Sequence, residues 1–310
     1  MIRWFCSCAV IFAFAGGAHS EELGDILGSI AKKHAGKVAI AFKHLKSGET
    51  YFLNADEPMG TASLIKLPVL IEVYFQVHEG KIKLTDPVTL RKEDMVPGSG
   101  VLTSHFSPGI TFPLSDAVSL MIAHSDNTAT NLVLDKIGIA SVGKRMKALG
   151  FPHTSIYAKV FKRSSSSIDM ESSKKFGLGS TTAREMVGIL EMVDGNKLVD
   201  AASCKAMVAT LKKCEDIMKF PRFLPPGVAI AHKTGSLDDA KTDAGLIYLK
   251  GGTVALCVLT ADNKDTRWVV DNAGNVLCAN IARAVADYCN AKYKPEPTAP
   301  KPIGANANRW

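Results

Sequence analysis

Hydrophobic residues recur at helical spacing just after residue 20 and then change to the spacing of strands. Across residues 23–31 they recur at intervals of about three to four positions, and the pattern ends in basic residues and a glycine, as helices commonly do. Residues 38–45 and 50–53 are apolar runs on either side of Ser47-Gly48, a typical turn dipeptide. We therefore predict an amphipathic helix followed by a β-hairpin.

The middle of the chain is dominated by helical patterns. Residues 67–77 are almost continuously apolar, which predicts a helix buried at the centre of the molecule. Residues 163–180 are polar and contain a run of serines, so we expect a long omega-like surface loop there, with a disordered connector as the alternative. Further amphipathic helices are expected at 114–122, 127–137, 141–149, 182–192 and 201–211.

The last part of the chain returns to strands and closes with a helix. Strands are predicted at 228–233, 242–249 and 253–260, and a helix at 275–291. If these strands and the N-terminal hairpin form one antiparallel sheet, the helical segment is an insertion and a cleft lies at the junction. The expected fold is α/β (α+β), with an α/β lobe made of 21–55 plus 225–293 and an all-helical lobe made of 56–224.

The two ends of the chain follow neither pattern. Residues 1–20 combine a short positive start, an apolar run and a small-residue end near Ser20, which predicts a cleavable secretory signal and a secreted or periplasmic protein. A retained membrane anchor is the alternative, but the apolar run is too short to span a bilayer comfortably, so no stable anchor is expected. Residues 294–310 are rich in proline and are expected to form a flexible tail.

Composition and charge narrow the function only a little. The chain has 310 residues, of which 46% are hydrophobic and 22% charged, as in an ordinary globular protein. The formal net charge of +7 becomes +6 when residues 1–20, which carry only Arg3, are removed. Lysine and arginine are spread along the chain without a basic block, so nucleic-acid binding is not expected. We expect a monomer.

Five cysteines lie beyond the predicted signal: Cys204, Cys214, Cys257, Cys278 and Cys289. This odd number permits at most two disulfide bonds, of which Cys204–Cys214 is the most plausible local one. Cys257 lies in an apolar run and is expected to be a small buried residue. No Cys-x-x-Cys or nearby histidine pair occurs, so neither a metal nor a cofactor is expected.

The candidate chemistry begins at Ser63 and Lys66. On a helix these two positions share a face, so the Lys66 amine can accept the proton of the Ser63 hydroxyl and make it a nucleophile. The spacing alone is weak evidence, because three other serines have a lysine at the same distance: Ser29, Ser141 and Ser172. Only Ser63 opens the buried apolar helix. Its alternative role is that of a helix N-cap.

Two short motifs follow Ser63 and Lys66 in order. Ser125-Asp126-Asn127 is expected in a loop between helices, and Lys233-Thr234-Gly235 ends a predicted strand. Their alternative roles are a helix cap and a surface lysine. Together the motifs make the set found in serine β-lactamases and penicillin-binding proteins. The chain therefore resembles the class A β-lactamase family over most of its mature length, and 181–186 resembles the segment that closes the omega loop of that family.

The resemblance implies a fold and a mechanism. The fold is a helical lobe beside an α/β lobe with an antiparallel sheet of about five strands. Ser63 would attack a β-lactam carbonyl to form an acyl-enzyme, Lys66 would accept its proton, and Ser125 would pass a proton to the departing nitrogen. Backbone N–H groups of Ser63 and Ser236 would form the oxyanion hole. The substrate would be bound by Asn127, Lys233, Thr234, Gly235 and Ser236.

Two regions depart from the family pattern. In this family a glutamate of the omega loop holds the hydrolytic water, and Glu171 is the only glutamate of this loop in the present sequence. Glu171 has no proline after it and lies closer to residue 181 than the family pattern places it. Asp169 is a second candidate carboxylate, and the alternative is that Glu171 is only a solvated surface charge. An arginine expected after the lysine motif is missing, since Thr242-Asp243-Ala244 occupies that region. His232 alternates to the opposite strand face from Lys233 and is expected to be structural.

The leading hypothesis is an exported serine hydrolase that opens β-lactams. A peptidoglycan DD-peptidase or transpeptidase relative shares the same residues, would act on a peptidoglycan-derived peptide, and would account for a poor deacylation loop. The third hypothesis is a non-enzymatic penicillin-sensing or acyl-trapping module.

Overall fold

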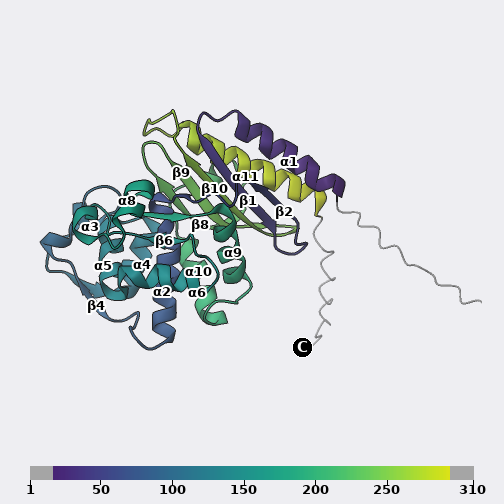
Figure 1. Cartoon of the computed structure of the whole chain (residues 1–310). Helices are drawn as coiled ribbons and strands as arrows, with labels where there is room; N and C mark the ends of the chain where they lie inside the picture. The colour runs from purple at the N-terminus through teal and green to yellow at the C-terminus, as the bar shows by residue number, and fades with distance from the viewer. Residues whose placement is uncertain (1–16, 294–310) are drawn as a thin grey trace, which may run out of the picture.

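The computed structural model describes residues 17–293 of the chain. A helical lobe lies beside a lobe built on one large sheet, and the sheet uses both the first and the last part of the chain (Figure 1). Most of the predicted signal and the predicted tail at 294–310 lie outside the described residues. The first helix, α1 (Gly17–Lys32), begins within the last residues of the predicted signal. Among the described helices, none is both long and apolar enough to span a membrane.

The large sheet has five antiparallel strands in the order β2-β1-β10-β9-β8. The predicted hairpin is β1 (Lys37–His44) and β2 (Thr50–Leu53), and the predicted C-terminal strands are β8 (Ala229–Ser236), β9 (Lys241–Leu249) and β10 (Gly252–Ala261). Because β1 pairs with β10, the two ends of the fold meet in the middle of the sheet. The expected α/β fold with a five-stranded antiparallel sheet is confirmed.

Alternating side chains give the sheet two buried faces. Along β1, Ile40 and Phe42 pack against α1 and α11 (Ala273–Lys292), which lie together on one face (Figure 1). Ala39 and Ala41 point the other way and join the larger core beneath the helical lobe. The small alanine side chains allow α9 (Ala183–Asp194) to pack closely on that face.

The helical lobe is built around α2 (Lys66–His78), which is buried along most of its length, as its continuous apolar pattern predicts. The helices around it are α4 (Leu114–Ala123), α5 (Asn127–Ile137), α6 (Ile139–Ala148), α9 and α10 (Ala201–Leu211). Several short strands also lie in this lobe and carry no clear sequence signal: β3 (Met59–Gly60), β4 (Pro87–Thr89), β5 (Thr111–Pro113), β6 (Ser155–Ile156) and β7 (Gly179–Thr181). The other short helical elements are η1 (Ala62–Ile65), η2 (Lys92–Asp94), α3 (Leu102–His105) and η3 (Phe220–Phe223).

The polar segment 163–180 contains two short helices, α7 (Arg163–Ser166) and α8 (Met170–Phe176), where the sequence predicts a loop. Asp169 caps α8, since its Oδ1 accepts a hydrogen bond from the Ser172 backbone N–H at 3.0 Å. Because α8 is short and buries little apolar surface, no hydrophobic periodicity marks it in the sequence.

Candidate active site

Ser63 lies in the 3₁₀ turn η1, directly before α2. The preceding residue, Ala62, has a φ of 48°, a left-handed conformation that is strained for a residue with a side chain. Thr61 holds the turn in place: its Oγ1 donates to the Gly179 carbonyl at 3.0 Å, and its own carbonyl accepts from Thr242 Oγ1 at 3.0 Å. Ser63 is half-buried and lines a pocket between the two lobes.

Lys66 is completely buried beneath this pocket. Its Nζ donates to the Ser125 carbonyl at 2.7 Å and to Asn127 Oδ1 at 2.9 Å, and it lies 3.2 Å from Ser125 Oγ. Burial lowers the pKa of Lys66 well below the usual lysine value, the charge of Lys233 lowers it further, and only Asp126 opposes the shift. The neutral amine is thereby favoured, and a general base must be neutral to accept a proton.

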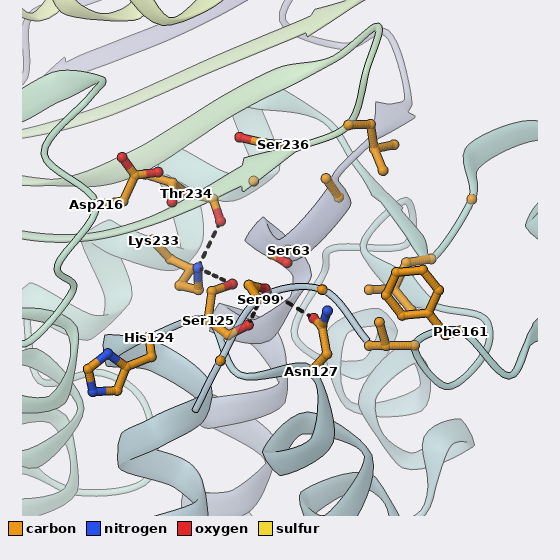
Figure 2. A pocket seen from close by; sticks show the side chains of 18 of the residues that line it. Ser63, Ser99, His124, Ser125, Asn127, Phe161, Asp216, Lys233, Thr234 and Ser236 are labelled. Carbon is orange, nitrogen blue, oxygen red and sulfur yellow. Dashed lines mark hydrogen bonds between the residues drawn. The ribbon is translucent and has the colours of Figure 1, made fainter. Parts of the chain in front are cut away.

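Ser125 and Lys233 meet from opposite lobes. Lys233 Nζ donates to Ser125 Oγ at 3.0 Å and to the Thr234 carbonyl at 2.9 Å, as Figure 2 shows. Since Lys66 Nζ lies 3.2 Å from the same Oγ, this hydroxyl lies between the amines of two buried lysines. Ser125 has a φ of 52°, again in the left-handed region. Strained backbone at both Ala62 and Ser125 is typical of functional sites.

Asp126, the middle residue of its motif, organises the backbone around the site. Its Oδ2 accepts hydrogen bonds from the N–H groups of Val101 and Leu102 at 2.7 and 2.9 Å, and its Oδ1 accepts from Ala129 at 2.8 Å. The carboxylate therefore joins the loop before α3 to the start of α5. It is buried and fully engaged, which identifies it as a residue that supports the fold.

Ser99 is a site residue that sequence reasoning missed. Its Oγ donates to the Ser125 carbonyl at 2.7 Å, and it lines the pocket beside Ser63 (Figure 2). In the same loop the Pro97 carbonyl accepts a hydrogen bond from Asn127 Nδ2 at 3.1 Å. The only signal in the sequence was the richness of residues 96–100 in glycine, proline and serine.

β8 brings the lysine motif to the same pocket because its backbone lies directly against the Ser63 turn. A Cβ added at Gly235 would lie 2.4 Å from the Thr61 carbonyl oxygen and 2.9 Å from the Leu64 nitrogen, so only glycine fits. Of the site residues predicted from the sequence, those that line the pocket are Ser63, Ser125, Asn127, Lys233, Thr234, Gly235 and Ser236.

Another wall of this pocket of ≈ 1530 Å³ comes from residues 158–164. Asn131 fixes that wall, since its Nδ2 donates to the Val160 carbonyl at 3.0 Å and its Oδ1 accepts from the Val160 N–H at 2.8 Å. Phe161 projects into the pocket region (Figure 2). No carboxylate comes from this wall; the acidic residues that line the pocket are Glu215, Asp216, Asp238 and Asp239.

Glu171 is not brought to this pocket. It is the second residue of α8, its side chain is exposed, and it is not one of the lining residues. Asp169 is the second candidate for the loop carboxylate. It lies at the start of α8, where its Oδ2 accepts a hydrogen bond from Ser172 Oγ at 2.7 Å. Neither carboxylate therefore faces Ser63.

The expected Cys204–Cys214 disulfide is not formed, and all five described cysteines are free. Cys204 is buried in α10, where its Sγ donates to the Leu198 carbonyl at 2.9 Å, whereas Cys214 lies beyond the end of that helix and lines the pocket. Cys257 is buried, as predicted. Within residues 17–293, no group of three or more His, Cys, Asp or Glu side chains could hold a metal ion.

A helical lobe inserted into an antiparallel α/β lobe, with the serine, lysine and SDN-type motifs at the junction, defines the fold class of serine β-lactamases and penicillin-binding proteins. The family model described as the beta-lactamase enzyme family matches residues 20–289. The chain belongs to this family, so the resemblance inferred from the sequence is confirmed at the family level.

Three distant relatives cover nearly the whole fold. The extended-spectrum beta-lactamase PER-1 of Pseudomonas aeruginosa is 22% identical over 286 residues, which are 89% of this chain and 90% of that protein. The crystal structure of a beta-lactamase from Sphaerobacter thermophilus has a TM-score of 0.75 at 29% identity, covering 87% of this chain and 97% of the other. The structure of PBP-A has a TM-score of 0.76 at 22% identity, covering 87% and 96%.

Proposed function

We propose that the protein opens the amide bond of β-lactams through an acyl-enzyme on Ser63. The observation that carries this proposal is the buried Lys66 amine, whose pKa is lowered by burial and by Lys233 and whose Nζ reaches the Ser125 hydroxyl. Membership of the beta-lactamase enzyme family and the similarity to the extended-spectrum beta-lactamase PER-1 support β-lactams as the substrate class.

In the acylation step the neutral Lys66 amine takes the proton of the Ser63 hydroxyl as Oγ attacks the β-lactam carbonyl carbon. The tetrahedral oxyanion is stabilised by the backbone N–H groups of Ser63 and Ser236. As the carbon–nitrogen bond breaks, the Ser125 hydroxyl gives a proton to the ring nitrogen. Ser125 regains that proton from the lysine amines beside it, which lie 3.0 and 3.2 Å from its Oγ.

Substrate binding uses the two sides of the pocket. The cationic Lys233, together with the hydroxyl groups of Thr234 and Ser236, suits a substrate carboxylate. The Asn127 side chain suits the amide of the substrate's side chain. We also propose that residues 1–20 direct export, which would place the enzyme where β-lactams first meet the cell.

A second candidate function is that of a penicillin-binding enzyme that acylates readily and deacylates slowly. The specific observation in its favour is the wall 158–164, which contributes no carboxylate to activate a hydrolytic water, while Glu171 is exposed on α8. An enzyme of this kind would act on peptides that end in D-alanyl-D-alanine and would be trapped by β-lactams.

The deciding experiment follows colour and intact mass after the purified protein is mixed with a chromogenic cephalosporin. Sustained turnover that disappears in Ser63→Ala supports β-lactam hydrolysis, and a stoichiometric adduct with little turnover supports the second candidate. Ser29→Ala is the matched control, because Ser29 also precedes a lysine at the same spacing but lies exposed on α1. If wild-type protein forms no adduct and shows no turnover, both functions are excluded.

Glu171→Gln tests the deacylation step separately. Because Glu171 is exposed and does not line the pocket, we expect turnover and the lifetime of the acyl-enzyme to stay within about twofold of the wild type. Stopped-flow kinetics and time-resolved mass spectrometry measure both quantities. An acyl-enzyme that accumulates only in the variant would show instead that α8 moves and that Glu171 activates the water.

A further inference from the structure

Cys214 lies at the edge of the same pocket but takes no part in the proposed reaction. Its backbone N–H donates to the Leu211 carbonyl at 3.2 Å, just past the end of α10. It is partly exposed and lines the pocket together with Ser125 and Lys233. The other four described cysteines are buried and do not line this pocket.

Near Cys214 lies a buried histidine, His232, which is paired with a buried aspartate, Asp243. His232 and Asp243 lie on adjacent strands, with solvent exposures of 1% and 0%, and His232 Nδ1 is 2.9 Å from Asp243 Oδ1. The other carboxylate oxygen, Oδ2, accepts the Phe220 backbone N–H at 3.0 Å. Gly245 faces His232 across the strands, where a Cβ would lie 2.4 Å from His232 Cβ. The imidazole is therefore fixed in one orientation.

The other nitrogen of this imidazole, Nε2, is buried and has no hydrogen-bond partner among the described residues. Cys214 lies close enough to His232 for its side chain and charge to raise the pKa of the imidazole. Burial alone would lower the pKa of His232, but the charge and hydrogen bond of Asp243, and then Cys214, outweigh burial and raise it to about 10. His232 is therefore an imidazolium at neutral pH.

The surroundings of Cys214 favour its thiolate. Burial raises the pKa of the thiol, but the nearby His232 imidazolium, the charge of Lys233 and the backbone N–H of Asp216 together lower it. In contrast, burial raises the pKa of Cys204, Cys257, Cys278 and Cys289. Besides Lys233, the other ionisable groups near Cys214, His232 and Asp243 are Asp216 and Lys219, before β8, Cys257 on β10 and Cys278 on α11.

We propose that Cys214, with His232 and Asp243 behind it, is a second nucleophilic centre of this pocket and a modification site for small electrophiles and low-molecular-weight disulfides. With a disulfide, the Cys214 thiolate attacks one sulfur, the reagent's S–S bond breaks, and its other half leaves as a thiolate. The protein sulfur is oxidised to a mixed disulfide and the leaving half is reduced. Because the adduct projects into the pocket beside Ser125 and Lys233, it slows acylation of Ser63.

The experiment treats the folded, full-length mature protein with iodoacetamide, locates the label by peptide mapping, and measures the labelling rate between about pH 5 and pH 9. We expect one fast label, on Cys214, whose rate at about pH 6 is still within about tenfold of its rate at pH 8. An ordinary thiol with a pKa near 8.5 loses about tenfold in rate for each pH unit. Cys204→Ser is the matched control and leaves the fast label unchanged, whereas Cys214→Ser removes it.

His232→Gln tests the cluster itself. We expect labelling of Cys214 at about pH 6 to slow by at least about tenfold, because the imidazolium that stabilises the thiolate is lost. Circular dichroism of the same samples shows whether the variant is folded. If this variant does not fold, the pH profile of the wild-type protein decides alone.

Three results overturn the proposal: an ordinary thiol pH profile at Cys214, faster labelling of another cysteine, or an unchanged rate in His232→Gln. The effect on acylation rests on the proposed function and is measured separately, by pretreating the protein with a small aromatic disulfide, adding fluorescent penicillin, and then repeating with a reductant. We expect acylation to fall at least about fivefold and to recover after reduction. If penicillin never labels Ser63, the proposed function fails while the alkylation result still decides the reactivity of Cys214.

Discussion

At the scale of single residues, the site gives different electrostatic surroundings to two lysines that contact the same hydroxyl group. Burial lowers the pKa of Lys233 as well, but the negative charges of Cys214 and Asp216 nearby oppose this effect. For Lys66, burial and the charge of Lys233 both lower the pKa, and only Asp126 raises it. Environments that push two titratable groups apart assign their roles. Lys233 is thus suited to hold an anion, and Lys66 to accept a proton.

Lys66→Ala should reduce the rate of acylation by about 10²–10⁴-fold, as expected for the loss of a general base. In the wild type the rate should rise as the pH passes through the lowered pKa of Lys66 and level off well below 10.5, because the base acts only when it is neutral. Stopped-flow acylation with a fluorescent penicillin measures both effects. Lys32→Ala is the matched control. A wild-type profile that rises only near 10.5 would show that burial does not neutralise Lys66.

The buried ion pair of His232 and Asp243 makes a prediction about stability. The pKa of His232 is raised in the folded state to about 10 from 6.5, so the contribution of the pair is fully present below about pH 6.5 and is lost as the pH rises through about 10. Asp243→Asn should lower the free energy of unfolding by about 3–5 kcal/mol at about pH 6, since it leaves a buried charge without its partner.

Urea denaturation of wild type and Asp243→Asn across this pH range measures the difference. The gap should narrow as the pH rises through about 10, because His232 then loses its proton in the wild type as well. Asp239→Asn, a change at an exposed aspartate of the neighbouring turn, is the control and should have little effect. A gap that stays constant with pH would mean that the loss comes from packing and not from the charge of His232.

At the scale of elements, the site depends on the close approach of β8 to η1. A Cβ at Gly235 would lie 2.4 Å from the Thr61 carbonyl and 2.5 Å from Thr242 Oγ1. Gly235→Ala should therefore displace β8 from the Ser63 turn and slow acylation by about 10²-fold, the usual effect of a displacement of about 1 Å in a reacting site. Gly28→Ala on α1 has room for the methyl group, with its nearest atom at 3.8 Å, and should acylate normally.

Acylation rates of both glycine variants, measured beside their circular dichroism spectra, check this prediction. Normal acylation by a folded Gly235→Ala variant would contradict it, because it would show that the strand can give way without disturbing the oxyanion site.

Elements with a strong apolar period could be predicted from the sequence, and those without one could not. The predicted helices at 127–137 and 201–211 coincide with α5 and α10, and the predicted strand at 50–53 coincides with β2. Short elements such as α8 and β6 are fixed by caps and tertiary pairing, so no period identifies them.

The candidate site also contains residues that could be predicted from the sequence and residues that could not. Ser63, Ser125 and Lys233 could be singled out because their motifs are local in sequence. The cluster of Cys214, His232 and Asp243 could not be predicted, because it depends on the register of β8 with β9. This register sets Thr234 opposite Asp243, so His232, two residues before Thr234, lies on the same face of the sheet as Asp243. Because side chains alternate along a strand, the sequence indicated that His232 and Lys233 point to opposite faces, but it could not show which residues His232 contacts there.

At the scale of the whole molecule, the pocket lies where the chain passes between the lobes. The Ser63 turn follows soon after β2, and the lysine motif lies on β8, the strand that returns the chain to the sheet. The catalytic groups are thus attached to both cores, and the pocket is built of rigid elements. Its rim is different: four of the exposed large apolar side chains belong to residues that line the pocket, namely Phe161, Met218, Leu237 and Trp268.

Such a rim suits substrates with a large apolar side chain, because binding would remove both surfaces from water. Trp268 is 68% exposed and is held in place by a hydrogen bond from its Nε1 to Asp238 Oδ1 at 2.6 Å. Trp268→Ala should raise KM about tenfold for a β-lactam with an aromatic side chain and leave kcat nearly unchanged, since the contact is the same in the ground and transition states. Steady-state kinetics, or acylation kinetics if turnover is slow, measure the two constants with one aromatic and one small polar β-lactam. Ile217→Ala is the matched control, because Ile217 is 67% exposed but does not line the pocket. Equal effects of the two variants, or equal effects on the two substrates, would mean that the rim is ordinary exposed surface and that selection takes place only at the residues around Ser63.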